Sequence, residues 1–356
     1  MSLKKIAEIT GVSYSTVSRV LSNPNYKCSS DELRNKILET ARELNYIPND
    51  AARNLKLGVK DGKNIFSVGL IIVGNEADNL NSFFNEMVIK IESEIHRSMC
   101  LLSNIWFKPE FSSDMCTEAK CRQIIASMTS SHSKPADGIL IIGRCTSVAM
   151  ALLKKHFKAV VCVNLDPVGK NLDEVTCSGK KNTALALEYL IKLGHRNIGY
   201  AGECNNDLSF IGFRDTLFIH NIELDISNVF ECEVSIQNGY DIIEKLIQYK
   251  KPPTAIYCQN DLLAVGMLRC LSKYKNRYYM PSVISCGDIE ESRFTKPMLT
   301  TIRIPKEEMA KYAVYLLLDK LTGGHTANVR IDLDGILIVR DSCTTPDSAM
   351  SCEYVI

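Results

Sequence analysis

The sequence predicts an N-terminal all-α, helix-turn-helix head joined to a larger two-lobed α/β core with parallel sheets flanked by helices. Three observations predict this class. The first 45 residues carry apolar side chains at helical spacing, and beyond residue 65 short apolar runs alternate with helical stretches. With 356 residues, 46% of them hydrophobic, the chain is long enough for two or three domains.

The head is expected to form three short helices between residues 3 and 45, with a turn at residues 11–13. Its apolar set is Ile6, Ile9, Val12, Val17, Val20 and Leu21. A longer helix is expected from about Ser29 to Leu44. Ser30 should cap its N-terminus, and the two acids that follow Ser30 are favourable in the first turn of a helix. Pro48 stops it.

Charge is distributed unevenly along the chain. Residues 1–60 hold ten Lys/Arg and six Asp/Glu, a balance of +4, whereas the whole chain is at +1 and the remainder is therefore at −3. A small basic head on a mildly acidic body indicates that the head binds a polyanion. Chance clustering of basic residues on a solvated surface is the alternative and would give the same charge distribution.

The core is expected to contain buried strands wherever a short run is continuously apolar. These runs are 66–73, 101–106, 137–142, 159–164, 197–201, 254–258 and 283–286. Helical stretches lie between most of them, for example 82–99, 179–193, 237–249 and 260–274. This alternation is typical of parallel sheets covered by helices, and so many strands predict two sheets with a cleft between two lobes.

Cysteine and histidine usage argues against a metal centre or a disulfide framework. The fourteen cysteines include no C-x-x-C pair and the six histidines are scattered, so we expect reduced, mostly buried cysteines and no metal or cofactor. Charges interrupt the only apolar stretch near Met1, and no run approaches the ~20 apolar residues of a membrane span. These features predict a cytoplasmic protein with no membrane partner.

The segment from Tyr14 to Leu21 has two chemically different faces when it is drawn as a helix. Tyr14, Ser15, Ser18 and Arg19 fall on one polar arc, opposite the apolar Val17, Val20 and Leu21. Arginine can bind guanine bidentately and hydroxyl groups can reach bases or phosphates, so such a helix suits the major groove of DNA. An ordinary amphipathic surface helix is the alternative.

Residues 3–23 (LKKIAEITGVSYSTVSRVLSN) and 43–55 (ELNYIPNDAARNL) resemble the LacI/GalR family of bacterial transcription regulators. The resemblance implies that Tyr14, Ser15 and Arg19 read base edges, and that Thr16, Ser18, Ser22 and Ser30 contact the DNA backbone or bases. Residues 48–57 resemble the family's hinge helix, which orders on operator DNA. There Leu55 would wedge into the minor groove, with further contacts from Tyr46, Asn49 and Ala52.

The resemblance extends through the core to about residue 345, in stretches at 136–142, 188–203, 212–217, 252–266 and 296–321. It implies a periplasmic-binding-protein-like core whose two lobes are joined by three crossovers, near 164–167, 290–296 and 322–330. The implied domains are a reader at 1–47, a hinge helix and linker at 48–64, a core at 65–345 and a tail at 346–356. The N-lobe would comprise about 65–164 and 296–322, and the C-lobe about 165–290 and 328–345. His195 would be structural rather than catalytic.

The expected effector pocket departs from the family pattern at three polar anchors, which read Ser178, Ser209 and Gly287 here. The pair Asn260 and Asp261 and the pair Phe83 and Phe84 are retained, and Arg144 and Asn164 are further candidates for the pocket. Three explanations stay open: a different effector, a degenerate pocket controlled by a protein co-regulator, or an alignment displaced by one residue, since Asp288 follows Gly287.

The predicted function is therefore a DNA-binding regulator, a repressor in the first instance, acting as a homodimer on a near-palindromic operator in the bacterial nucleoid. Its effector would be a sugar or related metabolite. A solute-binding protein would carry a signal peptide and would lack the DNA-binding head. An enzyme would need a phosphate loop, a nucleophile elbow or a metal triad, none of which the sequence carries, so no catalytic residue is predicted.

Overall fold

The computed structural model describes residues 3–13, 16, 17, 20, 30, 33, 36, 37, 40, 65–73, 82–113, 116–130, 135–169, 171–205, 207–274 and 279–346. For residues 3–5, 8, 82–84 and 130 it describes the backbone alone. The chain divides into two compact units, residues 1–65 and 66–356.

The described part of the head begins with α1 (Leu3–Thr10), which ends in the expected turn. Gly11 has a φ of 73°, a left-handed conformation that glycine adopts at little cost. The Ser30 hydroxyl accepts a hydrogen bond from the Leu33 backbone N–H at 3.2 Å, so the capping role expected for Ser30 is confirmed. Ile9, one of the expected apolar set, is 49% exposed.

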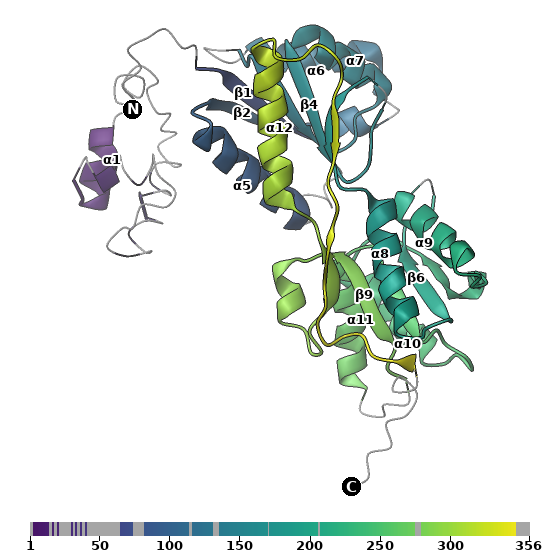
Figure 1. Cartoon of the computed structure of the whole chain (residues 1–356). Helices are drawn as coiled ribbons and strands as arrows, with labels where there is room; N and C mark the ends of the chain where they lie inside the picture. Colours follow the sequence, from purple (N-terminus) through teal and green to yellow (C-terminus); the bar gives the residue numbers. More distant parts are fainter. Residues whose placement is uncertain are drawn as a thin grey trace. The chain divides into compact units, whose positions relative to one another are not determined.

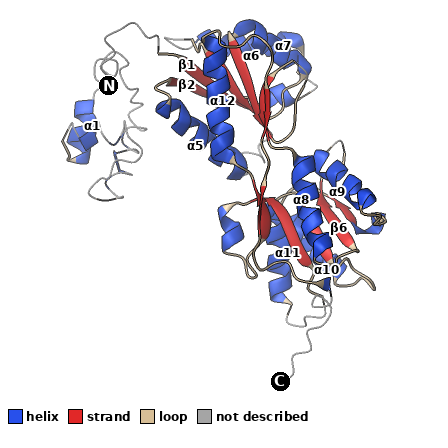
Figure 2. Cartoon of the chain, viewed as in Figure 1, coloured by secondary structure: helices blue, strands red, loops and turns tan. Residues whose placement is uncertain are grey.

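The N-lobe is built on a six-stranded parallel sheet in the order β11-β5-β4-β3-β1-β2 (Figures 1 and 2). Its strands are β1 (Ser67–Ile72), β2 (Leu101–Phe107), β3 (Gly138–Ile142), β4 (Ala159–Asn164), β5 (Asp173–Thr176) and β11 (Arg330–Asp332). Helices α5 (Ser82–Arg97) and α12 (Lys306–Leu321) contribute to the hydrophobic core on one face. Helices α6 (Glu118–Ser130) and α7 (Ser147–His156) contribute to the core on the other, beside the short helix η2 (Pro109–Ser112).

Strand β3 shows why the N-lobe sheet is covered on both faces. Leu140 and Ile142 belong to the core with α5 and α12, whereas Ile139 and Ile141 belong to the core with α6 and α7. Successive side chains of a strand point to opposite faces, so a strand that is apolar at every position needs helices on both sides.

The C-lobe carries the second sheet, in the order β12-β10-β9-β8-β6-β7. Its strands are β6 (Ile198–Gly202), β7 (Val229–Glu231), β8 (Ala255–Cys258), β9 (Ser282–Gly287), β10 (Thr300–Arg303) and β12 (Ile336–Ile338), and only β12 pairs antiparallel. Helices α8 (Gly179–Lys192) and α9 (Leu208–Ile219) pack on one face. Helices α10 (Ile236–Leu246) and α11 (Asp261–Lys273) pack on the other, and η3 (Ile226–Asn228) and η4 (Glu290–Arg293) lie in loops. Among the helices described, none is long and apolar enough to cross a membrane.

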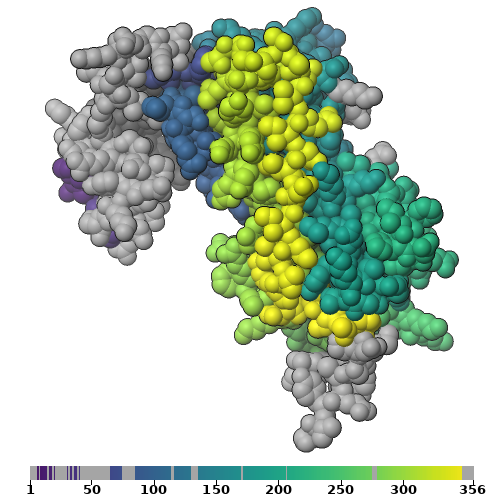
Figure 3. Space-filling model, viewed as in Figure 1, coloured from purple at the N-terminus to yellow at the C-terminus, as the bar shows by residue number. Residues whose placement is uncertain are grey.

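The chain passes between the two sheets three times, but not where the sequence suggested. The crossings lie between β5 and α8, between β10 and α12, and between β11 and β12. The expected crossings near 164–167, 290–296 and 322–330 were thus placed too early, because β5 still belongs to the N-lobe sheet and β10 still belongs to the C-lobe sheet. Figure 3 shows the yellow C-terminal part of the chain running over both lobes.

Most cysteines of the described residues are buried, as the sequence predicted. Nine of the twelve, Cys145 and Cys162 among them, are buried and three are partly exposed. Burial is the main cause that raises the pKa of Cys145 to about 12, which keeps this thiol protonated and unreactive at neutral pH.

Candidate functional site

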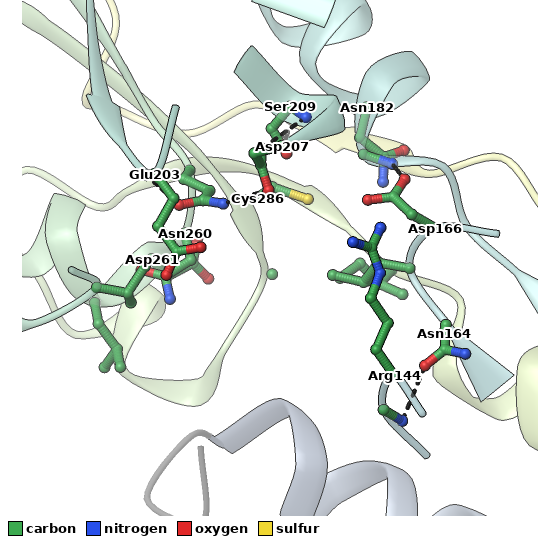
Figure 4. Close-up of a pocket in the computed structure, with 18 of the residues that line it drawn as sticks. Arg144, Asn164, Asp166, Asn182, Glu203, Asp207, Ser209, Asn260, Asp261 and Cys286 are labelled. Carbon is green, nitrogen blue, oxygen red and sulfur yellow. Dashed lines mark hydrogen bonds between the residues drawn. The ribbon is translucent and has the colours of Figure 1, made fainter. Parts of the chain in front are cut away.

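A cavity of about 340 Å³ lies between the two lobes of the body. Its lining comes from residues that directly follow β3 and β4 in the N-lobe and β6, β8 and β9 in the C-lobe, together with the first turns of α8, α9 and α11 (Figure 4). The carboxyl ends of parallel strands are the usual place for ligands in open α/β sheets. Because both lobes line the cavity, a molecule bound there would contact both.

The N-lobe wall is formed by a tight turn after β3. Gly143 has a φ of 99°, and a Cβ there would lie 1.7 Å from the Val73 carbonyl oxygen, so only glycine fits. Its N–H donates to Asn164 Oδ1 at 2.9 Å, while the buried Asn164 Nδ2 has no partner among the described residues. Arg144 follows the turn, is exposed, and forms no ion pair with any described residue.

Asp166 lies between this wall and the start of α8. Its Oδ1 accepts the Gly179 N–H at 3.0 Å, at the first residue of that helix, and Figure 4 shows its carboxylate beside Arg144. Burial raises the pKa of Asp166; the Gly179 hydrogen bond opposes this shift and the nearby Asp207 carboxylate adds to it. The carboxyl group is therefore held in a partly desolvated position with one oxygen already bound.

The C-lobe wall is an interlocked set of polar side chains. Asp207 caps α9 by accepting from the N–H groups of Ser209 and Phe210, at 2.8 and 3.2 Å. Its second oxygen accepts from Gln259 Nε2 at 2.9 Å, and Gln259 Oε1 in turn accepts the Glu203 N–H at 2.9 Å. Both ends of the Gln259 amide are thus bound, which fixes its orientation at the cavity.

At the end of the cavity formed by α11, the polar side chains are also held by several hydrogen bonds. Asn260 caps α11 by accepting the Leu263 N–H at 3.2 Å. The buried Asp261 accepts the Ser285 and Thr301 hydroxyls at 2.5 and 2.6 Å and the Ile289 N–H at 2.7 Å. Burial raises the pKa of Asp261 although these three donors oppose the shift.

Most of the effector residues predicted from the sequence meet at this cavity. Arg144, Asn164, Ser209, Asn260 and Gly287 all line it. Ser178 does not, because it precedes α8 as the N-cap residue and the neighbouring Gly179 occupies the lining position. The backbones of Phe83 and Phe84 lie in α5, and their side chains are outside the described residues.

Asp288 does not replace the carboxylate missing at Gly287. Its side chain is 2% exposed and is bound by Arg340 Nη2 at 2.5 Å and Arg303 Nε at 2.6 Å, away from the lining residues. Burial would raise the pKa of Asp288, but the hydrogen bonds and charges of Arg340 and Arg303 outweigh it and leave the pKa below its ordinary value. An alignment displaced by one residue therefore does not restore the family's polar anchor here.

Sequence reasoning missed the polar residues that dominate the lining, namely Asp166, Asn182, Glu203, Asp207 and Gln259. Asp166 follows the predicted strand 159–164 by two residues, and Gln259 directly follows 254–258. Polar residues just after buried parallel strands were therefore a usable signal. Asp207 and Asn182 carried no such signal, because they reach the cavity from the first turns of helices.

Few of the expected DNA-contacting residues belong to the described part of the chain. The Thr16 hydroxyl lies 2.9 Å from the Ser13 hydroxyl, and Ser30 caps the following helical residues. Tyr14, Ser15, Ser18, Arg19, Ser22, Tyr46, Asn49, Ala52 and Leu55 lie outside the described residues, as does the hinge segment 48–64.

His195 has the structural environment that the sequence predicted. The ring is fully buried, with Nδ1 2.9 Å from the Thr254 hydroxyl and Nε2 2.8 Å from the Thr344 carbonyl oxygen. Burial lowers the pKa of His195, which favours the neutral ring. It joins the start of β8 to the C-terminal segment, away from the lining residues of the cavity.

Comparisons with known proteins agree with both units of the chain. The family model "Bacterial regulatory proteins, lacI family" matches residues 2–49, and "Periplasmic binding protein-like domain" matches residues 187–343. The ribose operon repressor of Escherichia coli (strain K12) is 27% identical over 353 residues, covering 96% of this chain and 99% of that protein. The HTH-type transcriptional repressor PurR of Mannheimia succiniciproducens is 25% identical over 354 residues, covering 96% and 98%.

Solved structures show the same fold. The lac repressor dimer bound to operator and the anti-inducer ONPF matches 97% of this chain and 99% of its own, with a TM-score of 0.66 and 22% identity. The transcriptional regulator CelR in complex with cellobiose matches 96% and 100%, with a TM-score of 0.65 and 20% identity.

Head, lobes and cavity together define a DNA-binding transcription regulator with a periplasmic-binding-protein-like sensing core. Its head matches the lacI family of bacterial regulatory proteins, and the curated relatives named above are repressors similar to it over nearly the whole chain.

Proposed function

We propose that this protein represses transcription by binding a near-palindromic operator as a homodimer, and that a small molecule in the interlobe cavity controls its affinity for DNA. The cavity carries this proposal, because its lining is shared by both lobes and is made of polar groups already held in place. A ligand that bridges two lobes favours the arrangement in which it touches both, and so shifts the population of states.

The relatives support the repressor role. Proteins similar over nearly the whole chain are named as the ribose operon repressor and the HTH-type transcriptional repressor PurR, and the lac repressor structure contains a dimer on operator DNA. One head reads only a half-site, so a two-fold protein suits a two-fold operator. Exposed apolar side chains on neighbouring N-lobe elements, Ile89 in α5, Ile105 in β2 and Tyr315 in α12, are compatible with a subunit contact.

The DNA-binding role is tested by selecting operator sequences from a random duplex library with the full-length protein. We expect a near-palindromic consensus, and we expect the Arg19→Ala variant to lose preference for it while keeping weak, salt-sensitive binding, since phosphate contacts remain.

Arg122→Ala is the matched control, because Arg122 pairs with Glu118 on the exposed side of α6 in the body. It should select the same consensus as the unmodified protein. Equal sequence preference in Arg19→Ala would rule out the proposed reading role of this residue, and the absence of any consensus would refute operator recognition.

We also propose that the protein has no catalytic activity and works at the chromosome in the cytoplasm. The relatives are named as repressors, and a repressor must meet its DNA. Control by a protein co-regulator is the second candidate. The ordered polar lining of the cavity favours a small molecule over it.

A further inference from the structure

Formal charge is unevenly distributed around the cavity. Four acids line it, Asp166, Glu203, Asp207 and Asp261, whereas Arg144 is the one cation among the described lining residues. A desolvated cleft lined by one sign of charge concentrates ligands of the opposite sign. The lining therefore carries an excess of negative charge.

Nearby cations do not offset this excess, because each is bound to an acid outside the lining. Lys180 at the start of α8 pairs with Asp215 at 2.6 Å, and Lys181 pairs with Asp332 at 2.6 Å. In the C-lobe, Arg303 and Arg340 are both bound to Asp288.

The helix N-termini at the cavity are also closed to anions. A helix N-terminus is a ready anion site, since its first N–H groups are unpaired. Here Asp166 accepts the first N–H of α8, Asp207 accepts two N–H groups of α9, and Asn260 accepts an N–H of α11. Part of the N–H set that would bind a phosphate or carboxylate ligand is therefore already occupied.

We propose that the effector of this protein is a small polar molecule bearing a protonated amine, such as an amino sugar, and that Asp166 receives the ammonium group. This inference rests on the proposed effector-sensing role of the cavity and specifies the chemistry of its ligand. The same excess of negative charge disfavours phosphorylated and carboxylated metabolites.

Asp166 is the acid best placed for this contact. Both oxygens of Asp207 are engaged, and Asp261 accepts three hydrogen bonds. Asp166 accepts a hydrogen bond through Oδ1 alone, so Oδ2 has no hydrogen bond to the described residues, although Figure 4 shows the carboxylate beside the Arg144 guanidinium.

The cavity size agrees with a compact ligand. Its volume of about 340 Å³ is near the lower end of the roughly 300–1,000 Å³ typical of small-molecule pockets. A monosaccharide or a nucleoside suits this space better than an oligosaccharide.

The test compares ligands that share a scaffold and differ only in charge. Full-length protein is titrated with glucose, glucosamine and glucose 6-phosphate, and with adenosine, its amino-deoxy derivative and its monophosphate, using calorimetry and thermal shift. We expect the amine to bind at least about tenfold more tightly than the neutral member of its series, equivalent to about 1.4 kcal/mol, and the phosphate to bind most weakly.

Two variants assign the preference to Asp166. Asp166→Asn keeps an oxygen for the Gly179 N–H and removes the charge, so we expect amine and neutral ligands to bind alike. Glu118→Gln, which removes an exposed charge paired with Arg122 on α6 and outside the cavity lining, should keep the preference. Because the pKa of Asp166 is raised, affinity for the amine should also fall as the pH is lowered through that pKa.

The possible outcomes separate this inference from the function on which it rests. Tighter binding of a neutral or phosphorylated member overturns the amine assignment and leaves effector sensing intact. Stabilisation by no member of either series, in a protein that still selects an operator, contradicts small-molecule sensing in this cavity and favours control by a protein partner.

Discussion

Asp288 shows how a single buried residue can hold several distant segments together. Its carboxylate is bound by Arg303 at the end of β10 and by Arg340 beyond β12, and it adopts a left-handed backbone conformation with a φ of 49°. A buried carboxylate is tolerated only when it is paired and hydrogen-bonded. Asp288 therefore fixes the C-terminal segment to the loop after β9.

We expect Asp288→Asn to lower the free energy of unfolding by about 3 kcal/mol, because two arginines lose a buried charged partner. Urea denaturation of the full-length protein measures this change. The control is Glu118→Gln, which breaks an exposed pair with Arg122 and should cost less than about 0.5 kcal/mol. Equal losses in the two variants would contradict the structural role of Asp288.

The pKa of Asp288 also predicts how stability depends on pH. The folded-state pKa lies below the ordinary value, so the folded protein binds the Asp288 proton more weakly than the unfolded chain does. The stabilisation is complete above the unfolded pKa of about 3.9 and is lost as the pH falls through the folded value. Acid unfolding of Asp288→Asn should be less steep below about pH 4 than that of the unmodified protein.

The sequence predicted cavity residues correctly where residue type and position relative to a strand identify them. It failed where the role of a residue depends on a hydrogen-bond partner far away in the sequence. Arg144 and Asn164 were found at the carboxyl ends of predicted strands, where Asn164 is the last residue of one run and Arg144 follows another by two positions. Asp288 was considered a possible ligand contact, and its burial by Arg340 could not be read from residues 52 positions apart. Asp166 was visible in the sequence, but its hydrogen bond to Gly179 depends on a chain crossing that was placed too early.

At the scale of elements, α10 and α11 pack through two glycines that face each other's backbone. A Cβ on Gly239 would lie 2.0 Å from the Leu263 carbonyl oxygen, and a Cβ on Gly266 would lie 2.0 Å from the Ile236 carbonyl oxygen. Backbone cannot move aside as a flexible side chain can, so the two helices would have to separate.

Gly266→Ala should therefore lower the free energy of unfolding by about 2 kcal/mol, since overpacking outweighs the roughly 1 kcal/mol that alanine adds in helix propensity. A denaturation curve measures the change. Gly169→Ala is the matched control, because the nearest atom to its Cβ would be Leu172 Cδ1 at 3.5 Å, and stability should stay within about 0.5 kcal/mol. A neutral Gly266→Ala would show that the helices can separate freely.

All seven strands predicted from apolar runs are present. Of those that were missed, β12 is itself a short apolar run, whereas β5 is not. Strand β5 begins with Asp173 and Glu174, yet both are buried. Lys320 lies 3.0 Å from Asp173, and Arg330 Nε donates to Glu174 at 2.8 Å, about 150 residues along the chain. A charged strand of this kind becomes buried only through distant partners, which propensity and periodicity cannot reveal.

At the scale of the whole body, each lobe is assembled from separate parts of the chain. The N-lobe sheet takes β11 from residues 330–332 and the C-lobe sheet takes β12 from residues 336–338. Ser342 then accepts the Thr300 N–H at 2.8 Å and donates to the Val283 carbonyl oxygen at 2.6 Å. The last strands therefore stabilise both lobes at once.

A chain that ends at residue 321 should lose cooperative unfolding in both lobes, because each sheet lacks an edge strand and Asp288 lacks Arg340. Circular dichroism during heating measures this loss. A chain that ends at residue 346 keeps β11, β12 and Ser342 and should melt as the full-length protein does. A sharp transition of the shorter chain at the original temperature would show that the lobes do not need these strands.

The three crossings also govern the order in which the protein can be completed on the ribosome. The head is one continuous segment, residues 1–65, but the N-lobe sheet lacks a strand until residue 332 has been synthesised and the C-lobe sheet until residue 338. At about 5–20 residues per second this delay lasts roughly 14 to 55 s. Throughout that interval the apolar edges of two unfinished sheets are exposed, so we expect newly made chains to depend on chaperones most strongly while the body is being translated.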